Sequence, residues 1–186
     1  WGRTRPRFDF DNTAATIEMD AADCTLENVV LRATVSAVVV GVNIDNSDIL
    51  FKDVEFNFDA TGDYFVTMID ATTSGIGFHI IDCSLYAEAI AGAARGIYLS
   101  ASHETVIRNC IIMGNFSDSP ILNDTTASLR ILIENNFIYN DDTTTGNGII
   151  LTVASTGVIA NNRIGTLFAT NVTGLLDPGS CLCMEN

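Results

Sequence analysis

Apolar and polar positions recur along this chain with a period of about 26 residues. The repeat is anchored by apolar residues that are 25, 29, 27, 26, 26 and 25 residues apart: Leu26, Phe51, Ile80, Ile107, Ile133, Ile159 and Met184. The residue after the anchor is mostly charged or polar, and a second apolar position follows five residues after the anchor. Such alternation is typical of β-strands with one buried face. Each repeat therefore predicts two short strands joined by a turn.

An Asn or Asp stands two residues after every anchor, between the two apolar positions. Its members are Asn28, Asp53, Asp82, Asn109, Asn135, Asn161 and Asn186. Asn and Asp tolerate left-handed backbone and bond their own main chain, so this column predicts a sharp turn in each repeat. Stacked Asn side chains also form hydrogen-bonded ladders. We assign these turn and ladder roles to the first six residues of the column.

A further run of β-branched or aromatic residues precedes each anchor by ten to fifteen residues, as in Val38-Val39-Val40 and Gly148-Ile149-Ile150-Leu151. A repeat of this length is too short for two helices and a loop, but it suits three short strands, which form one coil of a solenoid. The sequence therefore predicts an all-β, right-handed parallel β-helix of six to seven coils. We expect it to span residues 21–186 and to continue beyond the chain given.

Charge is distributed unevenly along the chain, whose net charge is −14. Arg3, Arg5 and Arg7 lie within the first seven residues, whereas the other 179 residues carry six basic side chains against 23 acidic ones. An acidic body repels nucleic acid and anionic membranes, so we expect neither as a partner. Residues 1–20 are interpreted as a basic arm and entry segment, with the three arginines as its docking residues. A solvated tail is the alternative interpretation of the same residues.

The best-preserved copies of the repeat read Ile-Glu-Asn-Asn-Phe-Ile at 133–138 and Ile-Ala-Asn-Asn-Arg-Ile at 159–164. This pattern resembles the right-handed parallel β-helix proteins of the pectate-lyase-like superfold, and within that group the β-helix proteins of tailed bacteriophages. The resemblance implies a structural protein on the particle surface of a virion, which decorates or projects from the capsid. It also implies a homotrimer that contacts other virion proteins through the arm. The alternative is a tail spike that binds or cleaves a host surface polysaccharide.

Three carboxylates are candidates for the enzymatic alternative. Asp59, Glu88 and Asp141 each lie eight residues after an anchor, and Asp59 and Glu88 belong to adjacent coils. Retaining glycosidases hold two carboxyl groups about 5–5.5 Å apart, so a stacked pair would suit a glycosidase. A polysaccharide lyase is the other enzyme class that this alternative includes. Solvated loop carboxylates are the simpler interpretation in so acidic a chain. The sequence favours a protein without catalytic residues and leaves the enzyme alternative open.

Other candidate chemistry is sparse. Tyr86 and Tyr139 both lie six residues after an anchor, where an outward-facing ring could contact a sugar. The five cysteines have no metal-ligand spacing, and we predict neither a metal nor a cofactor. Cys83 and Cys110 share one position in neighbouring coils, which is compatible with a disulfide. We favour two free thiols stacked in an apolar column, because free Cys is usually buried.

Overall fold

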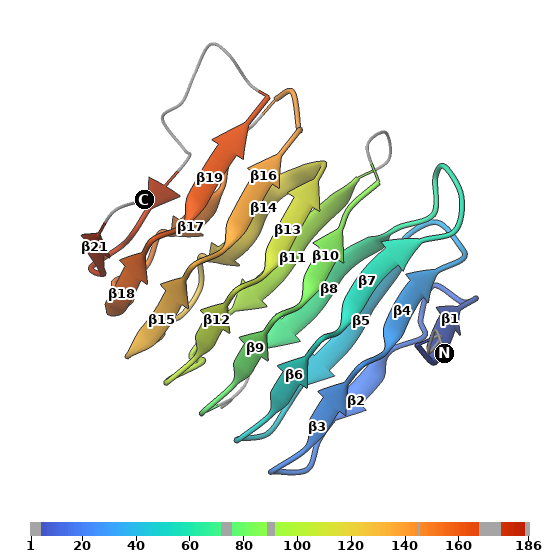
Figure 1. The fold of residues 1–186 in the computed structure, drawn as a ribbon, viewed down its shortest axis with the longest axis horizontal. Coiled ribbons are helices and arrows are strands. Elements are labelled where there is room, and N and C mark those ends of the chain that lie inside the picture. The colour runs from blue at the N-terminus through green and yellow to red at the C-terminus, as the bar shows by residue number, and fades with distance from the viewer. Residues whose placement is uncertain (1–4, 72–75, 89–91, 145, 168–175, 185–186) are drawn as a thin grey trace.

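The computed structural model describes residues 5–71, 76–88, 92–144, 146–167 and 176–184, and it shows a parallel β-solenoid without helices in these residues (Figure 1). Each coil contributes one strand to each of three seven-stranded sheets. The strands of each sheet lie side by side from the N-terminal to the C-terminal end (Figure 1). The all-β solenoid predicted from the period is therefore confirmed, whereas the right-handed winding stays a prediction.

The three sheets are numbered here in the order in which the chain enters them. Sheet 1 consists of β1 (Arg7–Phe10), β4 (Val30–Ala33), β7 (Glu55–Phe58), β10 (Ser84–Tyr86), β13 (Ile111–Gly114), β16 (Phe137–Asn140) and β19 (Arg163–Thr166). Sheet 2 consists of β2 (Ile17–Met19), β5 (Val38–Ile44), β8 (Phe65–Ala71), β11 (Ala93–Leu99), β14 (Phe116–Asn123), β17 (Ile149–Leu151) and β20 (Leu176–Asp177). Sheet 3 consists of β3 (Thr25–Glu27), β6 (Leu50–Lys52), β9 (His79–Ile81), β12 (Val106–Arg108), β15 (Ile131–Glu134), β18 (Gly157–Ala160) and β21 (Leu182–Met184).

The anchors of the repeat stack in register in sheet 3. Neighbouring strands pair Leu26 with Phe51 and continue through the intermediate anchors to Ile159. The last prediction is wrong by one residue, because Ile159 pairs with Cys183 and Met184 pairs with Ala160. Successive residues of a strand face opposite sides of the sheet, and Leu182-Cys183-Met184 has apolar side chains at all three positions, so on both sides. The spacing of the anchors therefore assigned the stacking position to Met184, whereas Cys183 occupies it.

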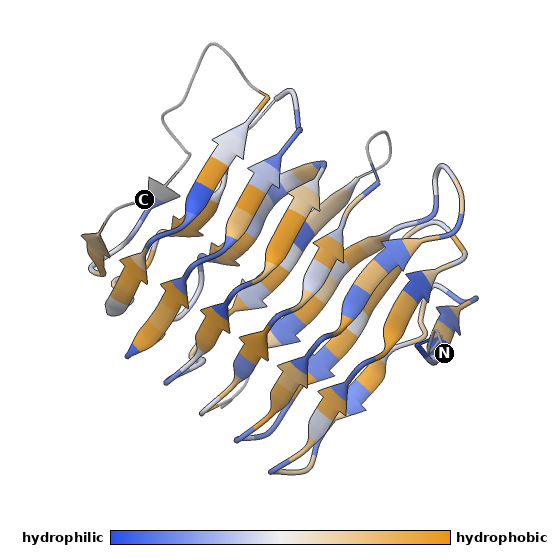
Figure 2. Ribbon diagram, in the orientation of Figure 1, coloured by the Kyte–Doolittle hydropathy of each residue, from blue (hydrophilic) through white to orange (hydrophobic). Residues whose placement is uncertain are grey.

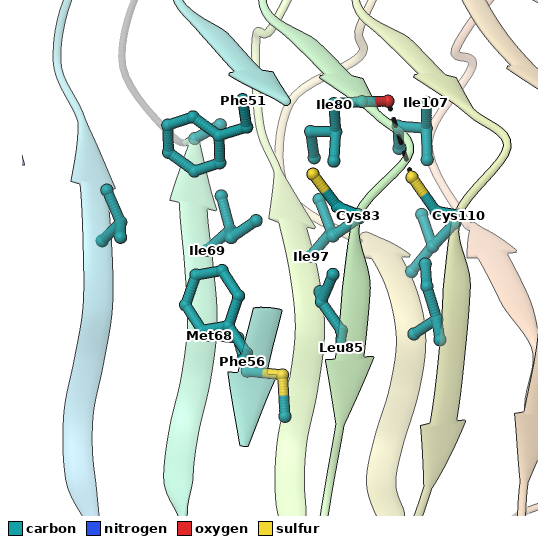
Figure 3. Packing of buried hydrophobic residues seen from close by; sticks show 14 of the residues in the cluster. Phe51, Phe56, Met68, Ile69, Ile80, Cys83, Leu85, Ile97, Ile107 and Cys110 are labelled. Atoms are coloured by element: carbon teal, nitrogen blue, oxygen red, sulfur yellow. Dashed lines mark hydrogen bonds between the residues drawn. The ribbon is translucent and has the colours of Figure 1, made fainter. Parts of the chain in front are cut away.

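The apolar positions of the repeat build one continuous interior. Hydrophobic residues recur at the same level of successive strands (Figure 2), and the anchors Phe51, Ile80, Ile107, Ile133 and Ile159 have no exposed surface. Figure 3 shows this packing around Ile69, Ile80 and Leu85. A side chain buried in this way contributes about 1.5–3 kcal/mol to folding relative to an exposed one. The repeated burial holds the coils together.

The turn column has the same backbone geometry in every coil that is described. The φ angle lies between 53° and 57° at Asn28, Asp53, Asp82, Asn109, Asn135 and Asn161. This is the left-handed region, which costs most residues about 1–2 kcal/mol and which Asn and Asp visit routinely. Asn186 lies outside the described residues. The repeated Asn or Asp therefore sets the corner between sheet 3 and sheet 1.

A buried amide ladder lies one residue after the turn column. Asn136 and Asn162 are buried, and Asn136 Nδ2 donates a hydrogen bond of 2.9 Å to Asn162 Oδ1. Asn136 Oδ1 also accepts from the backbone N–H of Cys110 at 2.9 Å, and its Nδ2 reaches the carbonyl of Ile107 at 3.0 Å. Within the turn column itself, Asn109 Nδ2 donates to Asp82 Oδ1 at 3.1 Å. Asn135 is exposed, so it sets the turn while its neighbour makes the buried bonds.

The first coil already includes residues that the sequence assigned to the arm. β1 pairs with β4 and β2 pairs with β5, so paired strands occur within residues 1–20. Arg5 forms ion pairs with Asp53 and Glu55, and Arg7 Nε lies 2.9 Å from Asp9 Oδ1. Arg3 lies outside the described residues. The described part of the basic segment therefore lies against the solenoid, because carboxylates of the first coils neutralise its charges.

Candidate functional site

The three predicted carboxylates lie in two different surroundings. Asp59 is half-exposed and forms an ion pair with Arg32, which also binds Asp9 with 3.0 Å between Nε and Oδ1. Glu88 is buried, and its negative charge acts on Asp141. Asp142, which is also buried, acts on Asp141 in the same way. Glu88, Asp141 and Asp142 therefore form one group of interacting carboxylates, whereas Asp59 belongs to an ion-pair network with Arg32.

Asp141 is the carboxyl group of this cluster whose protonation is altered. Partial burial raises its pKa above the usual value, and the charges of Asp142 and Glu88 raise it further, although its own backbone N–H opposes the shift. Its Oδ1 atom is buried and accepts no hydrogen bond within the part of the chain that the structure describes. A raised carboxyl pKa is what a general acid needs, but it is also the ordinary result of crowding acidic side chains.

Cys83 and Cys110 are buried free thiols on neighbouring coils, next to Leu85, Ile97 and Ile107 (Figure 3). The sulfur of Cys110 lies 3.6 Å from the carbonyl oxygen of Ile80, in the coil that carries Cys83. The hydrogen bond between the two thiols and then burial raise the pKa of Cys110 far above its usual range, whereas the same hydrogen bond lowers the pKa of Cys83. The two thiols are therefore free, buried and stacked on neighbouring coils, as the shared position in the repeat predicts.

The outer face of sheet 1 differs in character between its two ends. Its N-terminal half is charged: Arg32 joins Asp9 and Asp59, and the hydrogen bond from Arg32 is the largest cause that lowers the pKa of Asp9. Its C-terminal half carries apolar and aromatic side chains, which we call the aromatic face: Tyr86, Ile111, Met113, Phe137, Tyr139 and Arg163.

Strand pairing brings the members of the aromatic face together. Met113 pairs with Tyr86 on one side and with Tyr139 on the other, so the two tyrosines that the sequence placed outward stand in one column. Their strands are two strand spacings apart, which is about 9.6 Å. A Cβ atom on Gly165 would lie 3.1 Å from Cδ2 of Tyr139, so the absence of a side chain there leaves room for the ring.

Phe137 and Arg163 form the C-terminal edge of the aromatic face. The guanidinium carbon of Arg163 lies 5.8 Å from the ring centroid of Phe137, which is within the range of a cation–π contact. No carboxylate pairs with Arg163 within the described ranges, unlike the other arginines of those ranges, each of which forms an ion pair. This edge was not predicted from the sequence, because Phe137 stands there only as part of the repeat at 133–138, yet its side chain is exposed.

The described residues contain no group of three His, Cys, Asp or Glu side chains that could hold a metal ion. They also contain no helix that is long and apolar enough to cross a membrane. Comparison of the chain with protein-family models, with curated proteins and with solved structures finds no match.

Proposed function

We propose that this chain is a structural protein: a rigid β-solenoid rod on the surface of a tailed-phage particle. The observation that carries the structural role is the set of three seven-stranded parallel sheets, in which each coil bonds to the next on three sides. Rods of this kind resist local opening because every interior strand is paired on both edges. The virion setting and a homotrimeric assembly come from the sequence resemblance.

The basic segment supplies the attachment in this proposal. Arg5 and Arg7 lie at the N-terminal end of the rod, where their present partners are carboxylates of the same chain. An acidic surface on another virion protein would take the place of Asp53, Glu55 or Asp9. Because the exchange replaces one set of partly exposed ion pairs by another, attachment through these arginines should weaken at high salt.

Cryo-EM of the particle from which the chain comes tests this proposal. We expect a rod fixed at its N-terminal end, and we expect particles with Arg5→Glu and Arg7→Glu to lose the rod while the isolated variant stays folded. Arg130→Glu is the matched control, because this arginine also forms an exposed ion pair but lies far along the rod. A rod bound through its C-terminal end, or retained by the double variant, would contradict the proposal.

The aromatic face favours a second candidate, which is binding of a host surface polysaccharide. Tyr86 and Tyr139 offer rings in one outward column on strands two spacings apart, and Arg163 adds a cation over Phe137 on the same face. Tyr139→Ala should then weaken polysaccharide binding, whereas Leu129→Ala, at another exposed apolar position, should not. If Glu88→Gln abolished cleavage of that polysaccharide, the enzymatic form would be supported. Equal binding by both alanine variants would reject the candidate.

A further inference from the structure

A hollow of about 470 Å³ lies on the outside of sheet 2, at the N-terminal end of the rod. Residues 14–16 form one wall, and Val39 and Val40 of β5 form another. Glu18, Asn43 and Asp70 supply the polar side chains. Pockets that bind small molecules have this size and this combination of apolar walls with a few converging polar groups.

The wall formed by residues 14–16 is held in place by its own turn. Asn12 Oδ1 accepts a hydrogen bond from the backbone N–H of Ala14 at 2.8 Å, and the Asn12 carbonyl accepts one from Ala15 at 3.1 Å. The N–H of Val39 donates to the carbonyl of Thr13 at 2.9 Å, which ties the turn to β5. The hollow is therefore preformed, so a ligand would not have to order it.

The polar groups of the hollow converge because they stand in register. Asn43 pairs with Glu18 on β2 and with Asp70 on β8, so the three side chains lie one strand spacing apart, about 4.8 Å. Asn43 Nδ2 donates to Glu18 Oε2 at 2.8 Å and to Asp45 Oδ2 at 2.9 Å. With both amide hydrogens engaged, Asn43 offers its carbonyl oxygen as an acceptor.

We propose that this hollow binds the primary ammonium group of a small aliphatic amine. An ammonium group carries three N–H donors, and Glu18, Asn43 and Asp70 provide three acceptors on one column. The walls of residues 14–16, Val39 and Val40 would contact the methylene groups, and among the residues that the structure describes no basic side chain lines the hollow. The net charge of −14 draws cations to this surface. The site is separate from the aromatic face, so it does not depend on the proposed function.

Titration of the chain with n-butylammonium, followed by NMR of the Val39 and Val40 methyl groups at low salt, tests the proposal. We expect saturable shifts, and about tenfold weaker binding by Glu18→Gln, which loses a charge-assisted hydrogen bond. Glu27→Gln is the matched control, because Glu27 pairs with Lys52 on sheet 3, and it should bind as the native chain does. Val39→Lys should abolish binding, since a tethered ammonium would fill the hollow.

The competing ligands decide the chemistry of the site. n-Butanol lacks the charge and tetramethylammonium lacks the N–H donors, so both should bind at least tenfold more weakly than butylammonium. A peptide with one lysine side chain distinguishes a protein-borne ammonium from a free amine: binding as tight as that of butylammonium would extend the site to lysine, and weaker binding would restrict it to free amines. Equal binding of tetramethylammonium, unchanged binding by Glu18→Gln, or tighter binding of Ca²⁺ would overturn the proposal.

Discussion

The two halves of the rod fill the same interior with different chemistry. In the N-terminal half, Phe10 and Phe56 both contact Phe65 edge to face, with ring centroids 5.1 and 5.7 Å apart, and Phe51 contacts Phe78 at 5.5 Å. In the C-terminal half, buried side chains of Ser and Asn bond from coil to coil. Of the buried polar side chains in the described ranges, all but Thr67 lie at residue 88 or beyond.

Buried serines illustrate the second mode. Ser128 Oγ accepts from the backbone N–H of Ser102 at 3.1 Å, and Ser155 Oγ accepts from that of Ser128 at 3.1 Å. Asn123 Nδ2 donates to Ser128 Oγ at 2.8 Å. Ring packing depends on filling the interior volume, whereas these directional bonds depend on which residues face one another across the coils. The comparison teaches that one coil geometry can be stabilised by apolar volume or by satisfied polar columns.

Phe56→Ala should have the largest effect, because it removes a ring with no exposed surface from the aromatic half. We expect a loss of about 3–5 kcal/mol in the free energy of unfolding, measured with urea. Phe137→Ala is the matched control on the same sheet, since this ring is exposed, and it should cost about 1 kcal/mol or less. Similar losses in the two variants would contradict the aromatic core.

Asn136→Leu breaks the polar half and should cost about 2–4 kcal/mol, because it leaves the N–H of Cys110 and the carbonyl of Ile107 buried without their partner. Asn135→Ala is the control one residue away. It keeps the buried bonds and loses only the residue type that favours a φ of 56°, which should cost about 1 kcal/mol. The order of the two losses in urea unfolding is decisive, and a larger loss for Asn135→Ala would place the ladder in the turn column.

Asp141→Asn should have a smaller effect, and it should be stabilising. Because the folded state raises the pKa of Asp141, the folded chain holds this proton at pH values where the unfolded chain has lost it. Below the ordinary pKa of 3.8, Asp141 is protonated in both states and does not reduce the free energy of unfolding. The free energy of unfolding then falls as the pH rises through the folded pKa. The melting temperature of Asp141→Asn should exceed that of the native chain at pH 7, and the gap should close near pH 3.

Asp9→Asn, at the other end of the rod, should change the melting temperature in the opposite direction. Arg32 lowers the pKa of Asp9, so its contribution is present above the ordinary carboxyl pKa and is lost as pH falls through the folded value. The melting temperature of this variant should be slightly lower than that of the native chain at pH 7. In strong acid the two melting temperatures should be equal. A gain at pH 7 for Asp9→Asn, or a loss for Asp141→Asn, would show that the assigned surroundings are wrong.

The fold was predictable because stacked coils need apolar residues at the same positions in every coil, which gives the sequence a regular period. The anchors and the apolar residues five positions later are the two inward columns, and their strand pairing repeats the sequence alignment from Leu31 to Ile164. The buried bonds of Asn136 and Asn162 were not predicted because Asn135 and Asn136 are adjacent and both are Asn, as are Asn161 and Asn162. Which of the two faces inward depends on the direction of the backbone at the corner, and residue type does not specify it.

Surface sites were less predictable because they depend on which residues stack above one another. Asp59 and Glu88 share a position after the anchor, yet the neighbouring Arg32 pairs with Asp59, while Glu88 is buried near Asp141. The hollow beside Glu18 arises from a turn that packs on a strand of the next coil, a contact between residues without any shared pattern. The outward column of Tyr86 and Tyr139 could have been found by counting two coils.

Hydrogen exchange of side-chain amides tests the central claim most directly, which is that 26-residue coils stack with Asn136 directly against Asn162. The Nδ2 protons of Asn136 should exchange slowly, at rates similar to the backbone N–H of Cys110, because both groups are buried in coil-to-coil bonds. Those of exposed Asn135 should exchange rapidly. Fast exchange at Asn136, with protection at Asn135 instead, would contradict this register and with it the arrangement of the interior.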